Sequence, residues 1–311
     1  MSAPGESTAH IVQSLLVNLA IAIIKGIAAV LTKSGAMLAE ALHSSADCGN
    51  QVLLLIGVRG ARRPPDEDHP LGYGRDAYFW SFMVALLLFS GGGMFSIYEG
   101  VHKVLAPEKV EKAWLGLLIL GVSILLEGAA TLSNIREINK RRGAKPFGRY
   151  LTETKDSDLI VVFGENAAAV LGLGFAMIAL FLADRTHDGR WDGYGSIVIG
   201  LVLVGVAVFL AREVKSLLVG EAADPEIQAA ARKIAEEHPN LERVLHLVTI
   251  QQGPGEVLVS IKVSFAAGLA IDDVCRSINE FEATLRAKCP EVRWLYVEPD
   301  IPRDASKNAA A

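Results

Sequence analysis

Residues 34–58 read SGAMLAEALHSSADCGNQVLLLIGV, a stretch that is apolar enough to cross a bilayer yet carries His43 and Asp47. These two residues are four positions apart, so in a helix their side chains lie on one face and can converge on one ion. Imidazole nitrogen and carboxylate oxygen are ligands that zinc and its first-row neighbours accept. Polar groups at membrane depth are energetically costly and by default mark an ion or proton path. The stretch therefore predicts a divalent-metal site inside a membrane-spanning helix, and with it a transporter.

The composition agrees with a membrane protein that also has a soluble part. Apolar residues make up 51% of the chain, and they are concentrated in blocks. The net charge of −5 gives no indication of nucleic acid as a partner. The three cysteines, Cys48, Cys275 and Cys289, are too few and too scattered for a disulfide framework or a zinc-knuckle spacing. The first residues, MSAPGESTAH, lack the basic region and cleavable apolar core of a signal peptide, so we expect the first apolar segment to be retained.

Six apolar segments are long enough to span a bilayer, which takes about 20 residues. We expect them near residues 11–31, 36–58, 78–101, 114–134, 158–183 and 194–217. Basic residues gather in the linkers after the second and fourth segments, and such linkers face the cytoplasm. They are Arg59, Arg62, Arg63 and Arg75 in the first linker, and Arg136, Lys140, Arg141, Arg142, Lys145, Arg149 and Lys155 in the second. We therefore expect a multi-pass protein with both termini on the cytoplasmic side, in the inner or plasma membrane if the source is bacterial.

The chain after the sixth segment has the pattern of a small soluble domain. DPEIQAAARKIAEEH is an amphipathic helix with an Asp-Pro start, and two alternating strands, RVLHLVTIQQ and EVLVSIKVSF, flank a GPG turn. A second helix and a short strand, VRWLYVEP, complete an αββαβ order typical of a ferredoxin-like α+β fold. The expected domains are an N-terminal tail (1–10), a six-helix transport domain (11–217), a cytosolic domain (220–303) and a disordered tail (304–311). An open sheet of this kind commonly pairs with a copy of itself, so we expect a homodimer.

Taken together, these features resemble the cation diffusion facilitator family. The resemblance covers roughly residues 10 to 300 and includes six spans, an HxxxD on the second span and the cytosolic αββαβ tail. The strings HSSADCGNQVLLLIG, HPLGYGRDAYFW, GENAAAVLGL and YVEPD are similar to the branch that contains zinc transporter 9. The resemblance implies a proton-coupled metal antiporter that is a homodimer, with one transport site built from the second and fifth spans.

Only some of the ligand positions that the resemblance implies carry metal-binding residues in this chain. His43 and Asp47 fall on the two ligand positions of the second span. On the fifth span the family commonly has His or Asp and then Asp four residues later, where this chain has Glu165 and Ala169. Glu165 can bind a metal, whereas Ala169 cannot. The fourth ligand is then Asn166, a water molecule, or Glu40, which lies three residues before His43 on the same helix face.

Some residues in the spans have simpler explanations. His43 by itself could be a hydrogen-bonded packing residue. Glu165 could form an interior ion pair, with Lys25 of the first span as the partner. Glu99 and Glu127 are expected near the membrane ends, interfacial or paired. The glycine runs SGGGMFS and LGLGF are expected to let helices approach each other closely.

A second metal site is conceivable in the linker PPDEDHPLGYGR, where Asp66, Asp68 and His69 lie close together. Relatives that bind metal here tend to use a second histidine where this chain has Tyr73. A solvated loop turned by Pro-Leu-Gly is the favoured interpretation. In the cytosolic domain only His246 lies where a family ligand is expected, so we expect no complete metal cluster there and a role in dimerisation.

Two alternatives to metal–proton exchange are an acyltransferase and a passive metal channel. HxxxD is also an acyltransferase signature in which the histidine is a general base, but that enzyme needs a soluble pocket and this motif lies in a spanning segment. A passive metal channel is a second alternative. We expect no cofactor, and His, Asp and Glu ligands favour Zn²⁺ as the transported ion, while added oxygen ligands would also accommodate Mn²⁺, Fe²⁺ or Co²⁺.

Overall fold

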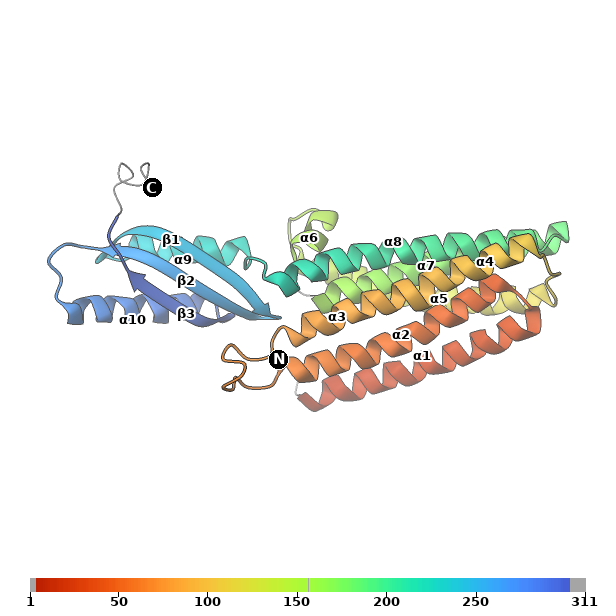
Figure 1. The fold of residues 1–311 in the computed structure, drawn as a ribbon, viewed down its shortest axis with the longest axis horizontal. Coiled ribbons are helices and arrows are strands. Elements are labelled where there is room, and N and C mark those ends of the chain that lie inside the picture. Colours follow the sequence, from red (N-terminus) through yellow and green to blue (C-terminus); the bar gives the residue numbers. More distant parts are fainter. Residues whose placement is uncertain (1–3, 156, 303–311) are drawn as a thin grey trace. The chain divides into compact units, whose positions relative to one another are not determined.

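The structure is a computed structural model that describes residues 4–155 and 157–302. It consists of two units (Figure 1): Met1–Gly60 with Ala77–Lys215, and Ala61–Asp76 with Ser216–Ala311. The first unit is helical. Its elements are α1 (Pro4–Thr32), α2 (Gly35–Ala61), α3 (Asp76–Leu87), the π-helix η1 (Leu88–Met94), α4 (Phe95–Leu105), α5 (Ala113–Arg141), α6 (Phe147–Glu153), α7 (Ser157–Thr186) and α8 (Arg190–Val219).

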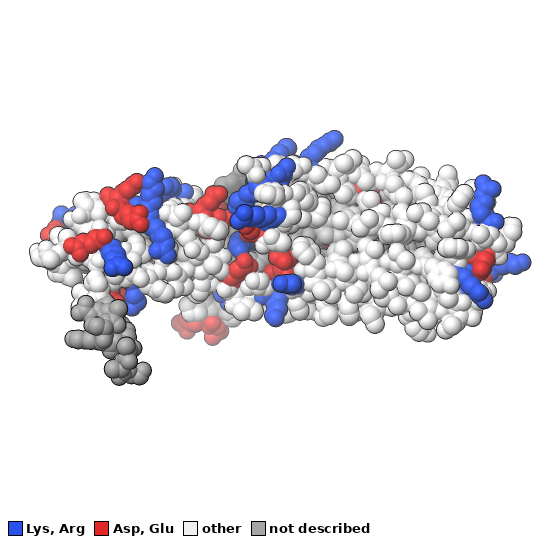
Figure 2. Space-filling model, turned by 90° about the horizontal axis from the view of Figure 1, so that it is seen from above, with Lys and Arg blue, Asp and Glu red and all other residues white. Residues whose placement is uncertain are grey.

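The helical unit is a membrane domain. Four helices among the described residues are long and apolar enough to cross a bilayer: Asp76–Leu105, Ala113–Arg141, Leu159–Thr186 and Arg190–Val219. A shorter apolar helix covers Asn18–Thr32, and α2 has 27 residues but carries the polar side chains that the sequence singled out. On the face seen in Figure 2, charged side chains gather at the two ends of the helical unit and leave its middle almost free of charge. This distribution is the one that a hydrocarbon layer requires.

Helix bounds differ from the expected segments in three places. α1 begins at Pro4, within the stretch expected to be a tail. The short helix α6 in the basic linker was not predicted. The third segment is divided into α3, η1 and α4, and the π-helix η1 contains the SGGG run. The predicted tail 304–311 lies outside the described residues.

Glycines bring α4 and α8 into backbone contact. A Cβ added to Gly100 would lie 2.6 Å from the carbonyl oxygen of Gly193, and one added to Gly200 would lie 2.7 Å from that of Gly93. No larger side chain fits at these crossings, so the run SGGGMFS serves close helix packing, as expected.

A buried aspartate ties together three helix ends at one end of the helical unit. Asp192 of α8 is completely buried and accepts hydrogen bonds from Ser34 Oγ (2.5 Å) and from the backbone N–H of Gly35 (2.5 Å), at the start of α2. Lys103 Nζ of α4 lies 3.0 Å from Asp192 Oδ2. The carboxylate therefore caps the N-terminus of α2 and pairs with a buried lysine at the same time.

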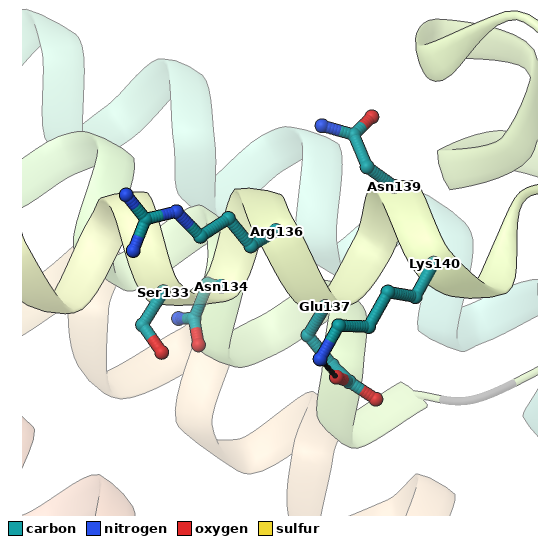
Figure 3. A pocket seen from close by; sticks show the side chains of 6 residues that line it. All are labelled: Ser133, Asn134, Arg136, Glu137, Asn139 and Lys140. Atoms are coloured by element: carbon teal, nitrogen blue, oxygen red, sulfur yellow. Dashed lines mark ion pairs between the residues drawn. The ribbon is translucent and has the colours of Figure 1, made fainter.

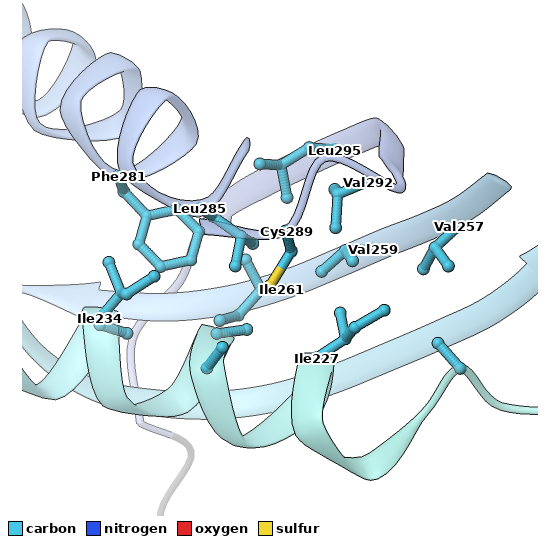
Figure 4. Close-up of a cluster of buried hydrophobic side chains, with 14 of the residues drawn as sticks. Ile227, Ile234, Val257, Val259, Ile261, Phe281, Leu285, Cys289, Val292 and Leu295 are labelled. Carbon is cyan, nitrogen blue, oxygen red and sulfur yellow. The ribbon is translucent and has the colours of Figure 1, made fainter. Parts of the chain in front are cut away.

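The second unit contains the αββαβ domain that the sequence predicted. Its elements are α9 (Pro225–Glu237), β1 (Leu241–Gly253), β2 (Glu256–Phe265), α10 (Ile271–Lys288) and β3 (Val292–Pro299). The sheet order is β1-β2-β3, with β1 and β2 antiparallel and β2 and β3 parallel. Alternate residues of β2, from Val257 to Val263, pack against both helices around Phe281 and Leu285 (Figure 4). This cluster gives the domain a hydrophobic core of its own.

Candidate metal-transport site

His43 and Asp47 lie side by side within α2, as their spacing predicts. His43 is 1% exposed, and its Nδ1 is 3.6 Å from Asp47 Oδ1, which is too long for a hydrogen bond. Neither ring nitrogen of His43 nor Oδ1 of Asp47 has a hydrogen-bond partner among the described residues, although all three atoms are buried. Buried polar atoms are normally satisfied, and leaving them unpaired is costly. The unprotonated ring nitrogen of His43 and Oδ1 of Asp47 are therefore available to an ion.

Glu165 of α7 is held by a residue that the sequence analysis did not single out. Asn50 is completely buried in α2, and its Nδ2 donates a 2.5 Å hydrogen bond to Glu165 Oε1. The amide oxygen of Asn50 has no partner among the described residues. The signal in the sequence was the spacing, because Asn50 follows His43 by seven residues and Asp47 by three and so lies on the same face of α2.

The alignment of α2 against α7 shows which part of α2 lies at the level of Ala169. A Cβ added to Gly172 would lie 2.5 Å from Glu40 Oε1, whereas Asn50 contacts Glu165. The two helices are thus antiparallel, and Ala169 lies between the levels of Glu40 and Asn50, in the stretch that contains His43 and Asp47. A methyl side chain therefore lies on α7 between the levels of Glu40 and Asn50.

Lys25 pairs with Glu40 and not with Glu165. Its Nζ lies 3.3 Å from Glu40 Oε2 and donates a 2.9 Å hydrogen bond to Ser44 Oγ. The expected pairing of Lys25 with Glu165 is wrong, because Glu165 of α7 contacts Asn50, ten residues beyond Glu40 on α2. Glu40 keeps one oxygen, Oε1, without a partner among the described residues.

Glu127 was expected near a membrane end, but it lies at the centre of α5. Its carboxyl group lies within coulombic range of Lys25, Asp47 and His43. Thr131, one turn further along α5, donates to the backbone carbonyl of Glu127 at 2.8 Å. Glu127 therefore adds a further acid to the surroundings of the site.

The structure brings the predicted ligands together only in part. His43 adjoins Asp47, and Glu165 is bound to Asn50. Asn166 is half-buried, and its backbone carbonyl accepts a 3.4 Å hydrogen bond from Thr131. Among the described residues, no three His, Cys, Asp or Glu side chains are grouped closely enough to hold a metal ion together.

The residues of the predicted second site belong to an internally bonded loop. Asp66 accepts hydrogen bonds from the backbone N–H of His69 and from the Tyr73 hydroxyl, both at 2.7 Å. The bond from Tyr73 and, after it, the bond from His69 hold the pKa of Asp66 below its usual value. Asp68 is exposed and takes no part in these bonds. Both oxygens of Asp66 are thus used within the loop.

Two surface features of the described residues, a groove on α5 and the surroundings of His246, are not assigned to the transported ion. A groove on α5 (Figure 3) is lined by Ser133, Asn134, Arg136, Glu137, Asn139 and Lys140. All six come from one helix, and Glu137 pairs with Lys140 at 3.9 Å, so the groove belongs to the surface of α5. In the second unit, His246 is exposed on β1 and pairs in register with Lys262 of β2, whose Nζ lies 2.7 Å from Glu298 Oε1.

Comparison with known proteins decides the family. The sequence profile of the cation efflux transmembrane domain matches residues 11–219, about two thirds of the chain. The chain belongs to the cation diffusion facilitator family. It therefore carries the multi-pass transmembrane domain of that family, and the match includes α2 and α7, which carry the residues described above.

Relatives agree with this assignment. The chain is 32% identical over 267 residues to the proton-coupled zinc antiporter SLC30A9, mitochondrial, of Xenopus laevis, a match that covers 85% of this chain and 47% of that protein. It is 29% identical to metal tolerance protein C4 of Arabidopsis thaliana, covering 81% and 55%. The chain thus spans about half the length of these relatives. It is also 20% identical to the magnetosome protein MamB of Magnetospira sp. (strain QH-2), covering 91% of this chain and 92% of that protein. A solved MamM C-terminal domain in its nickel form aligns with 25% of the chain and 98% of that domain, at 14% identity and a TM-score of 0.23.

Proposed function

We propose that this chain exports a divalent metal cation, Zn²⁺ above others, in exchange for protons. The observation that carries the proposal is the set of buried, unpartnered donor atoms of His43 and Asp47 inside a helix of the membrane domain. The zinc and proton specificity is supported by the name of the SLC30A9 relatives, proton-coupled zinc antiporter. The acyltransferase alternative is not proposed, because the family consists of transporters.

We assign the ion to His43, Asp47 and Glu165. Asn50 holds Glu165 through Oε1, which leaves the other carboxylate oxygen for the ion, as outer-shell partners of ligands commonly do. The amide oxygen of Asn50 is our preferred fourth donor over Asn166 and Glu40, because it is buried without a partner while Lys25 binds Glu40. Since the three ligands do not already form a cluster, the ion draws them together on binding.

Proton exchange follows from the nature of these ligands. A metal ion binds neutral imidazole and ionised carboxylates, so its arrival releases the protons that occupied them. Coupled groups of this kind share the competition between one metal ion and protons. The metal ion and the protons therefore occupy the same groups in turn, and this competition couples their movement in opposite directions.

We propose a topology of six membrane spans with both termini in the cytoplasm. The spans are α1, α2, the α3–α4 helix, α5, α7 and α8, and the basic linkers set the orientation. A cysteine at Arg142 should be labelled from the cytosol and one at Asp188 from outside. The reverse pattern of labelling would contradict this topology.

The C-terminal domain, residues 220–303, is proposed to form the dimer. Its own core allows it to fold alone, and we expect it to self-associate whether or not Zn²⁺ is present. Sedimentation of the isolated domain measures this directly. Association that requires Zn²⁺ and is lost in His246→Ala would show that the domain senses metal instead.

The transport function is tested in sealed vesicles that contain the purified protein and a pH-sensitive dye. Zn²⁺, Mn²⁺, Fe²⁺ and Co²⁺ are each added to one side, under an imposed pH gradient. Exchange predicts proton movement only when a transported metal is present, with Zn²⁺ giving the largest response. Metal uptake without proton movement would indicate a channel, and a larger response to one of the other ions would assign the exchanger to that ion.

A further inference from the structure

A buried ion pair adjoins the proposed site but supplies none of its three assigned ligands. Lys25 of α1 is 1% exposed, and Glu40 of α2 is completely buried. Lys25 Nζ is 3.3 Å from Glu40 Oε2 and 2.9 Å from Ser44 Oγ, so the ammonium bridges two positions one turn apart on α2. His43 lies between these positions in the chain.

Stability alone does not explain this pair. A buried ion pair is often no more stabilising than apolar residues of similar volume, because both charges lose their hydration. Glu40 also leaves Oε1 without a partner among the described residues, close to the backbone of α7 at Gly172. Ionisable residues at membrane depth under these conditions point to a role in the ion path.

The pair lies within electrostatic range of the proposed ligands. Glu40, His43 and Asp47 are spaced three and four residues apart and share one face of α2. Lys25 lies within coulombic range of His43 and Asp47. An uncompensated ammonium at this place would repel a divalent cation, because charges separated by a few ångströms in a poorly hydrated interior interact strongly.

We propose that Glu40 and Lys25 are positioning residues that set the charge of the transport site. Glu40 neutralises Lys25, so that a divalent ion meets the two negative charges of Asp47 and Glu165 and no net positive charge from α1. The pair thereby matches the site to a charge of +2. This inference rests on the proposed function and names the residues that tune the same site.

The test compares three variants of the full-length protein by calorimetric titration with Zn²⁺ in detergent. Glu40→Gln leaves Lys25 charged and should weaken Zn²⁺ binding tenfold or more. Lys25→Met removes the positive charge and should bind Zn²⁺ as tightly as the unaltered protein or more tightly. The double variant Lys25→Met/Glu40→Gln should return to within threefold of the unaltered protein, because the pair is neutral in both. A merely structural role would instead weaken binding in both single variants.

Three outcomes would overturn the inference: Glu40→Gln within threefold of the unaltered protein, a double variant as weak as Glu40→Gln, or a tenfold loss in Lys25→Met. If Glu40→Gln does not fold, recovery of folding in the double variant would identify the uncompensated charge of Lys25 as the cause. A double variant that also fails to fold, or a tenfold loss of Zn²⁺ affinity in Lys25→Met, would contradict the inference. Failure of the proposed function looks different. In that case the unaltered protein does not bind Zn²⁺, or Asp47→Ala binds it equally well.

Discussion

Asn50→Ala tests whether the carboxamide of Asn50 organises the transport site. The substitution removes a 2.5 Å hydrogen bond to the Glu165 carboxylate and the unpartnered amide oxygen beside it. A hydrogen bond to a charged group contributes about 1.5–3 kcal/mol. Since about 1.4 kcal/mol corresponds to a tenfold change in affinity, Zn²⁺ binding should weaken by about 10- to 100-fold. Calorimetric titration of the purified protein gives this ratio.

The matched control is Asn139→Ala, an exposed asparagine on α5 (Figure 3), which should leave the affinity unchanged. A double-mutant cycle separates the two roles of Asn50. In a Glu165→Gln background, Asn50→Ala should cost less than it does alone, because the two residues act through one hydrogen bond. If Asn50→Ala binds Zn²⁺ within threefold of the unaltered protein, or more tightly, then Asn50 does not position Glu165 for the ion.

Three further predictions address the ligand type, the helix-end network and the loop. His43→Asp exchanges nitrogen for oxygen and should shift transport from Zn²⁺ toward Mn²⁺, measured as the ratio of initial uptake rates in vesicles. Asp192→Asn leaves Lys103 buried without a counter-charge and should destabilise the protein by about 3–5 kcal/mol, seen as a lower melting temperature. Tyr73→Phe should raise the pKa of Asp66 toward 3.8, measured by NMR of ¹³C-labelled aspartate. Because the pKa of Asp66 is lowered in the folded loop, its bonds stabilise the loop fully above pH 3.8 and are lost as the pH falls through the lowered value.

Patterns along a single element predicted much of what the structure shows. The αββαβ order followed from alternation and turn residues, and the pairing of His43 with Asp47 followed from helical spacing. The third span was harder, because a π-helical turn depends on how closely Gly93 and Gly100 pack against α8. That packing partner cannot be read from the apolar pattern of the span itself.

Contacts between helices could not be predicted, because the register of one helix against another is set by tertiary packing. The sequence placed Glu165 on the fifth span but not beside Asn50, and it placed Lys25 in the first span but not beside Glu40. A shift of one turn between α2 and α7 would separate Glu165 from Asn50. The family resemblance supplied the identity of the ligand positions, and at Ala169 it could not say what replaces the missing ligand.

Zinc uptake by Asp47→Ala in sealed vesicles tests the central claim most directly. Asp47 provides a buried, unpartnered oxygen, and its removal takes away one of the two charges that balance the ion. Asp68→Ala, in the exposed loop, is the matched control and should transport normally. We predict that Asp47→Ala folds, because alanine is readily tolerated at membrane depth, and that it takes up no Zn²⁺ above empty vesicles. Wild-type uptake by Asp47→Ala would contradict the assignment of the transport site.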